Sequence, residues 1–361
     1  SGSYARAGAV TACYVLGTAV GTPVLGRVAD TAGRRPVLVT AGAANAVGLA
    51  SLALVPLHYE LVLYVVAAAS GACLPPVAPA VRSLWRGLAP AGQTSSLYAI
   101  DATLQEITFM VGPALVALLS SLASASTALI VSGVIGLGGT VAVTSHPATA
   151  TRPAQRDAPG PALSERPKAR TPALAVLSVM TALFLTSIAS VEVTVVAFAG
   201  HHHRADMAGV LLVVWSAGSL VGGLSFGARM AHAGPRAIAP LMLAAAAGFA
   251  ALALAPGITI LYPLLFAAGT AIAPGFSLIY DVVGRTTPPA VSVEAFSWIS
   301  SAIQLGASAG AAMGGVLVEA TGTSLSFVIA GGIGIFTTFV ATAGSRLLVR
   351  AVKRPVPLTC D

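Results

Sequence analysis

The chain has 361 residues, of which 56% are hydrophobic and only 9% are charged. A soluble protein of this length would carry roughly 90 charged side chains, because about a quarter of an ordinary domain is charged. The charge is too scarce to cover a water-soluble surface, which excludes a soluble enzyme, a DNA-binding domain and a disordered scaffold. Most of the chain is therefore expected to lie in lipid, and its net charge of +7 has to be interpreted by position.

Eleven apolar runs are long enough to span a membrane. A transmembrane helix needs about 20 apolar residues, because the hydrocarbon layer is about 30 Å thick. The runs lie near 8–26, 36–56, 61–81, 95–120, 123–144, 173–199, 207–227, 236–256, 258–280, 292–317 and 324–346. Each run is continuous rather than alternating, which is unlike a membrane β-barrel. The sequence therefore predicts an all-α polytopic membrane protein.

The basic residues indicate the orientation of these spans. If the first span runs inward, 17 of the 19 Lys and Arg residues fall on the cytoplasmic side, and only Arg6 and Arg204 fall outside. Lys and Arg are enriched in cytoplasmic loops. We therefore expect a multi-pass protein of the bacterial plasma membrane with a cytoplasmic C-terminus, and we expect no nucleic-acid partner.

A polar gap divides the spans into two groups. Its many Pro, Ala and Arg residues are typical of a flexible linker. The predicted divisions are a five-span bundle at 1–145, a cytoplasmic linker at 146–172, a six-span bundle at 173–350 and a cytoplasmic tail at 351–361. One more helix before Ser1 would carry the start of the chain outside and make the bundles equal. We therefore expect a first helix to be missing from this chain.

Two of the predicted cytoplasmic turns repeat at an offset of 201 residues. The first reads GRVADTAGRR from Gly26, and the second reads GARMAHAGPR from Gly227. Both copies keep the two glycines and the final Arg, but Asp30 has no acidic equivalent in the second copy. Parallel halves related by an axis along the membrane normal are a transporter architecture.

The first of these turns, extended to GRVADTAGRRPVL, resembles the loop between the second and third helices of the major facilitator superfamily. The resemblance implies two pseudo-symmetric helical bundles that rock around a central cavity, with twelve helices in the full protein. It also implies that Asp30 and Arg34 act in a conformational gate, within a loop motif that includes Gly26, Gly33 and Arg35. Physically, the glycines permit a tight reversal, and Asp30 can pair with the arginines or cap a neighbouring helix. A simple topological anchor is the alternative.

The fourth predicted span contains FMVGPALVALL, which resembles a shortened Gly-Pro signature of the superfamily's exporters. Gly112 and Pro113 match that signature, and such a pair bends a helix. An ordinary helix kink is the alternative. The chain also departs from the family at Ala67, because exporters resembling proton antiporters usually carry Arg at this position.

The same span carries three polar residues at membrane depth, Asp101, Gln105 and Glu106. Ionisable residues in the bilayer are costly and are candidates for function. Asp101 and Gln105 share a helix face, whereas Glu106 lies about 100° further round and near the middle of the bilayer. Glu106 is the leading candidate for binding a proton or a cationic substrate, and a structural hydrogen bond to a neighbouring helix is the alternative.

Other polar residues are secondary candidates. Glu192 lies near the outer end of its span, where it either lines a vestibule or is an interfacial carboxylate. Gln304 lies at mid-depth, where it either contacts substrate or bonds another helix. Asp281 and Glu294 flank the inner ends of their spans and are expected to be solvated charges or helix caps.

These patterns predict a secondary active transporter that moves a small molecule by alternating access, with proton-coupled efflux of drug-like or metabolite substrates as the leading hypothesis. An uptake permease and a non-transporting sensor or inactive relative are the alternatives. The spans contain no catalytic motif and the chain has no phosphate-binding loop for ATP, so we expect no enzyme activity, cofactor or metal. The expected partners are substrate, protons and lipid, with the chain a monomer.

Overall fold

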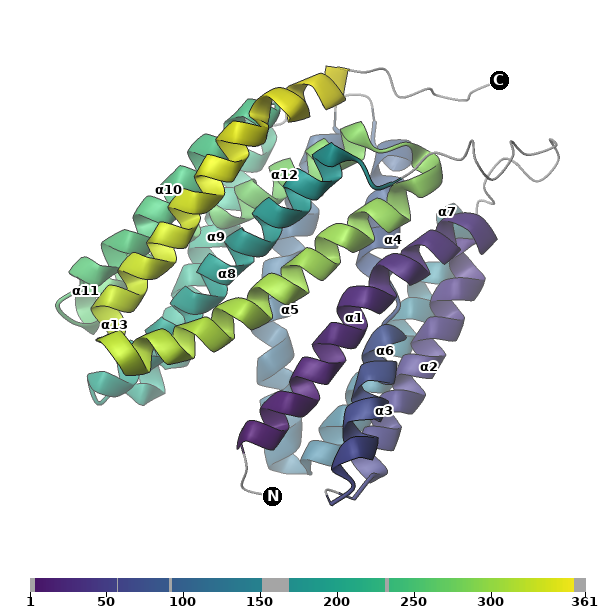
Figure 1. The fold of residues 1–361 in the computed structure, drawn as a ribbon, viewed down its shortest axis with the longest axis horizontal. Coiled ribbons are helices and arrows are strands. Elements are labelled where there is room, and N and C mark those ends of the chain that lie inside the picture. The colour runs from purple at the N-terminus through teal and green to yellow at the C-terminus, as the bar shows by residue number, and fades with distance from the viewer. Residues whose placement is uncertain (1–3, 57, 91–92, 151–168, 231–233, 354–361) are drawn as a thin grey trace. The chain divides into compact units, whose positions relative to one another are not determined.

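The computed structural model describes residues 4–56, 58–90, 93–150, 169–230 and 234–353, and within these ranges it is helical without any strand (Figure 1). The α-helices are α1 (Tyr4–Ala32), α2 (Arg34–Leu54), α3 (Glu60–Ala72), α4 (Val77–Leu88), α5 (Thr94–Leu122), α6 (Ala125–Ser145), α7 (Pro147–Ala150), α8 (Pro172–His201), α9 (Ala208–Met230), α10 (Ile238–Ala251), α11 (Ile258–Gly269), α12 (Ile272–Thr286) and α13 (Ser292–Lys353). Short 3-10 turns are η1 (Ala205–Met207), η2 (Pro235–Ala237), η3 (Leu252–Leu254) and η4 (Pro289–Val291).

Each predicted span coincides with helical structure. Among the described residues, nine segments are long and apolar enough to cross a membrane. The longest, Pro289–Lys353, contains two predicted spans. Gly322 separates them within α13, because its φ of 76° is not helical. The prediction of an all-α polytopic membrane protein is confirmed.

Two spans that were expected to be continuous are interrupted. The span predicted at 61–81 divides into α3 and α4 at residues 73–76, and the span predicted at 258–280 divides into α11 and α12 at residues 270–271. Proline explains both breaks, because its ring clashes with the preceding helical turn. Pro76 and Pro274 lie 198 residues apart, five residues after Gly71 and Gly269 respectively. The interruptions therefore occupy equivalent positions in the repeat.

The chain divides into two compact units, each discontinuous in sequence. Unit 1 comprises residues 1–84, 112–171 and 287–305, and unit 2 comprises 85–111, 172–286 and 306–361. In unit 1, α1 packs against α3 and α2 packs against α6. In unit 2, α9 packs against α11 and α12. Residues 151–168 of the predicted linker and 354–361 of the predicted tail lie outside the described residues, and the sequence-based division into two bundles stays a prediction.

The two units repeat one glycine-mediated helix contact. A Cβ atom built on Gly17 or Gly21 of α1 would overlap the backbone of α3. One built on Gly218 of α9 would overlap the backbone of α11, and one built on Gly222 would overlap the backbone of Thr270, directly after α11. The pairs are again 201 residues apart. Small residues allow membrane helices to approach closely. This shared packing is structural evidence for the predicted internal repeat.

We expect Gly218→Ala to lower the thermal stability of the purified protein, because the new methyl group would overlap the Phe266 carbonyl oxygen. Overpacking of this kind costs about 1–3 kcal/mol. Gly136→Ala on α6 is the matched control, since no atom lies within 4 Å of a Cβ built there. Equal melting temperatures for the two variants in detergent would show that the α9–α11 contact is not tight.

The repeated turns share a backbone feature. Gly33 precedes α2 with a φ of 105°, and Gly234 precedes η2 with a φ of 57°. Side chains disfavour these positive values, so glycine is required for the reversal. In both copies, a glycine with positive φ therefore directly precedes the helical segment that follows.

Candidate functional site

The carboxylate of Asp30 lies at the end of α1 and caps the start of α13. It accepts hydrogen bonds from the backbone N–H groups of Val293, at 3.3 Å, and Glu294, at 2.9 Å. The first N–H groups of a helix have no partner within the helix, and the helix dipole favours a negative charge there. Arg34 interacts electrostatically with the same carboxylate. Of the partners expected for Asp30, the structure thus shows both a helix N-terminus and an arginine.

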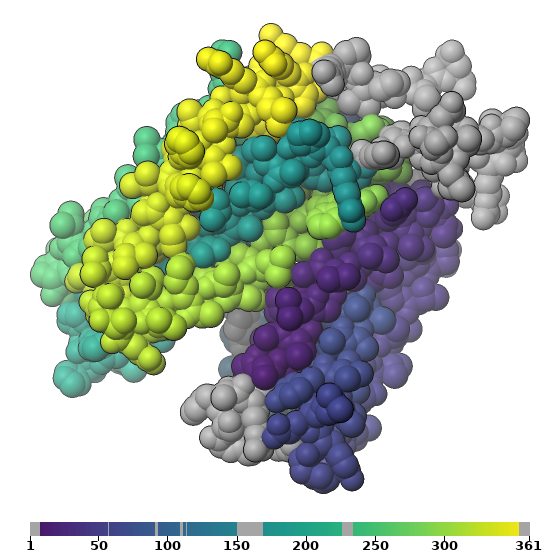
Figure 2. All heavy atoms as spheres, in the orientation of Figure 1, coloured from purple at the N-terminus to yellow at the C-terminus, as the bar shows by residue number. Residues whose placement is uncertain are grey.

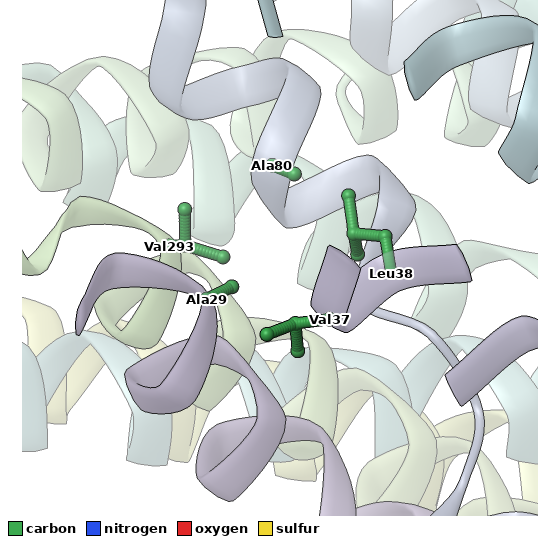
Figure 3. Close-up of a cluster of buried hydrophobic side chains, with 5 residues drawn as sticks. All are labelled: Ala29, Val37, Leu38, Ala80 and Val293. Atoms are coloured by element: carbon green, nitrogen blue, oxygen red, sulfur yellow. The ribbon is translucent and has the colours of Figure 1, made fainter. Parts of the chain in front are cut away.

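An apolar cluster holds this cap in place. Figure 3 shows the buried side chains of Ala29, Val37, Leu38, Ala80 and Val293, which come from α1, α2, α4 and α13. Ala29 directly precedes the capping residue Asp30, and Val293 is one of the two capped residues. The cluster therefore fixes the two helix ends that the hydrogen bonds join.

Gly26 makes the close approach of α1 and α13 possible. A Cβ built there would overlap the Ser297 hydroxyl and lie 3.1 Å from the Cα of Glu294. Glu294 itself is only 7% exposed, so of the two alternatives predicted for it, a solvated charge or a helix cap, the structure excludes the solvated charge. The reason is that the cap by Asp30 draws the first turn of α13 into unit 1.

The second polar group surrounds Glu106 on α5, within unit 2. The half-buried Glu106 carboxyl interacts with the fully buried hydroxyl of Ser219 on α9. The Ser219 oxygen in turn accepts the backbone N–H of Ala273, at 3.1 Å. A hydroxyl that accepts one bond can donate its own proton to another group. A chain of polar interactions through Ser219 therefore connects Glu106 to the first turn of α12.

This chain ends at a helix interruption. Because α11 ends at Gly269 and α12 begins at Ile272, the Ala273 amide is one of the first amides of α12, which have no hydrogen-bond partner within the helix itself. Interrupted helices in corresponding positions of two repeats point to the binding site of a transporter. Hydropathy did not reveal Ser219, although its position beside Gly218 and Gly222 on the close-packed α9 face is visible in the sequence.

Gln105 on α5 and Glu192 on α8 also belong to unit 2. Tyr280 of α12 donates a hydrogen bond from its hydroxyl to Gln105 Oε1, at 2.8 Å. Glu192 is exposed on α8 and interacts electrostatically with Glu106. Asp101 is half-buried and has polar interactions of its own. Four sequence-predicted residues thus share unit 2.

Gln304, Gly112 and Pro113 belong to unit 1. Gln304 is half-buried on α13. The helix α5 continues through Gly112 and Pro113, and it passes from unit 2 to unit 1 at this pair. The structure therefore does not group these three residues with Glu106.

An ion-pair network holds the start of α5 in unit 2. Asp281 is 4% exposed, so of its two predicted alternatives, a solvated charge or a helix cap, the solvated charge is excluded. Its carboxylate pairs with Arg285 at 2.8 Å and accepts a hydrogen bond from the Ser95 hydroxyl at 2.9 Å. The spacing of four residues between Asp281 and Arg285 was a sequence signal for this pair. The contact with Ser95 links residues 186 positions apart, so local sequence could not reveal it.

The sequence profile of the Major Facilitator Superfamily matches residues 1–201. A search of curated protein sequences gives no match. Similar solved structures include the human organic anion transporter MFSD10 (TETRAN), with a TM-score of 0.72 and 16% identity over 93% of this chain and 83% of that protein. The E. coli fucose:proton symporter FucP has a TM-score of 0.67 and 14% identity over 96% and 91% of the two chains. A bacterial homologue of the iron transporter ferroportin has a TM-score of 0.66 and 15% identity over 98% and 92%.

Proposed function

Because the chain belongs to the major facilitator superfamily, we propose that it is a secondary active transporter that exports a small molecule in exchange for protons. The observation that carries the proposal is the chain of polar interactions from Glu106 through Ser219 to the Ala273 amide. It joins an ionisable group at membrane depth to the point where a spanning segment is interrupted.

Glu106 has the properties of a group that binds a proton in one state of the transport cycle and substrate in another. A carboxylate in a lipid-embedded fold is costly, so it is stable only with a hydrogen-bond donor, a proton or a cation. Ser219 supplies the donor, and Glu192 adds a second negative charge within electrostatic range. A cationic or polar substrate would displace the proton from Glu106, which would couple the two movements.

Asp30 and Arg34 would supply the conformational gate. The cap on α13 has to break if α1 and α13 separate during alternating access. Its two charge-assisted hydrogen bonds and the apolar cluster around Val293 support a contact that is stable but can be remade.

The resemblance of Gly112 and Pro113 to the exporter signature supports efflux, and the distribution of Lys and Arg supports a cytoplasmic C-terminus. The proposal thus predicts a substrate that moves outward while protons move inward, without ATP hydrolysis by this chain.

We expect cells that express the protein to accumulate less of at least one compound from a library of drugs and metabolites than cells with an empty vector. A proton uncoupler should abolish the difference, because it removes the driving force. Mass spectrometry of washed cells measures the accumulation. Greater accumulation in expressing cells would indicate uptake, and a difference that survives the uncoupler would contradict proton exchange.

A further inference from the structure

A basic groove lies at one end of unit 2. Its lining residues are Arg236, Ser345, Arg346, Val349 and Arg350, and its volume is about 310 Å³. Arg236 lies in the turn η2 that leads into α10, and the others lie on the last turns of α13, which are yellow and on the surface in Figure 2. The groove is at the end of these helices that the Lys and Arg distribution predicts to be cytoplasmic.

Among the residues that the structure describes, no acidic side chain pairs with the three arginines of this groove. All three are exposed, and within the described parts of the chain none forms an ion pair with a carboxylate. Like charges that share a surface destabilise one another, and a cation at a helix N-terminus, as Arg236 is, opposes the helix dipole. An anion in the groove would relieve both costs.

Unit 1 contains a groove at the equivalent position. It is lined by Arg35, Pro36 and Val39 of α2 and by Val141, Thr144 and Ser145 of α6, with a volume of about 360 Å³. Offsets of 201 residues relate Arg35 to Arg236, Thr144 to Ser345 and Ser145 to Arg346. The repeat therefore explains the groove itself, but not the two additional arginines that only unit 2 carries.

The flank of α13 beside the basic groove is apolar. Phe339, which is 67% exposed, precedes Arg346 by seven residues and Arg350 by eleven, so the three share one helix face. Ile335 and Phe336 add exposed apolar surface one turn away. Apolar surface below a cluster of guanidinium groups suits an amphiphile with an anionic head.

We propose that this groove binds the phosphate of an anionic membrane phospholipid, whose acyl chains lie along the Phe339 flank. Arginine forms paired hydrogen bonds with phosphate oxygens, and basic pockets between spanning helices bind anionic headgroups. The proposal does not depend on the transport function.

The test is native mass spectrometry of the purified, delipidated full chain with phosphatidylglycerol and, separately, phosphatidylcholine. We expect phosphatidylglycerol to bind more tightly to the unaltered protein. In Arg346→Gln/Arg350→Gln this binding should weaken roughly 30-fold, because each basic group strengthens binding to anionic lipid about fivefold. Arg346→Lys/Arg350→Lys keeps the charge and should retain most of the affinity, and Arg35→Gln in the unit 1 groove should leave it unchanged.

Equal binding of the two lipids, or undiminished phosphatidylglycerol binding by the double Gln variant, would overturn the proposal. So would competition by inorganic phosphate alone at the concentration of the lipid, because the ligand would then be a free anion. The changed side chains are exposed, and an unaltered melting temperature without lipid confirms that each variant is folded.

Discussion

Glu106→Gln is expected to abolish gradient-driven transport while leaving the protein folded and inserted in the membrane. Glutamine keeps the size of the side chain and can still accept the Ser219 hydrogen bond, but it cannot take up or release a proton. The measurement is uptake of the identified substrate into proteoliposomes with and without an imposed pH gradient. Exchange of labelled for unlabelled substrate without a gradient should survive, because it needs no change in protonation.

Glu319→Gln is the matched control, since Glu319 is an exposed carboxylate on α13 and its loss should leave transport intact. Full gradient-driven activity of Glu106→Gln would remove Glu106 from the mechanism. Loss of exchange as well as of driven transport would show that substrate binding itself requires the Glu106 carboxylate.

Asp30→Ala is expected to lower both the transport rate and the stability of the protein. The change leaves the N–H groups of Val293 and Glu294 without their acceptor. Removal of a helix cap costs about 0.5–2 kcal/mol. The measurements are the melting temperature in detergent and the initial rate of substrate transport in proteoliposomes.

Two variants calibrate the Asp30 result. Asp30→Asn retains an acceptor without the charge and should fall between Asp30→Ala and the unaltered protein. Asp206→Ala removes an exposed carboxylate that pairs with Arg204 at 3.5 Å, and such surface pairs contribute little. A melting temperature and a rate for Asp30→Ala equal to those of Asp206→Ala would show that the cap is dispensable.

The sequence predicted the spans well because their length follows from the thickness of the bilayer. It also identified the turn at Gly33 and its repeat at Gly234, because few residues other than glycine adopt a positive φ. The interruptions at 73–76 and 270–271 were missed, since a hydropathy window records apolar character and not helix continuity. Pro76 and Pro274 were the available signals.

The candidate site could be predicted only in part. Glu106 stands out because a carboxylate is rare at membrane depth. Its partner Ser219 does not, because a lone serine in a spanning helix is common and the contact joins residues far apart in the chain. The burial of Asp281 and Glu294 was mispredicted for a related reason: hydropathy places them near span ends, but tertiary contacts with Ser95 and Asp30 decide their exposure.

In the proposed mechanism, Glu106 carries the proton that substrate displaces. The measurement adds saturating substrate to the detergent-solubilised protein in weakly buffered solution and records proton release with a pH-sensitive dye. The unaltered protein and Glu319→Gln should release roughly one proton for each substrate molecule bound, because one carboxyl group binds one proton. Glu106→Gln should bind substrate and release none. Equal proton release from Glu106→Gln, or none from the unaltered protein, would contradict the claim.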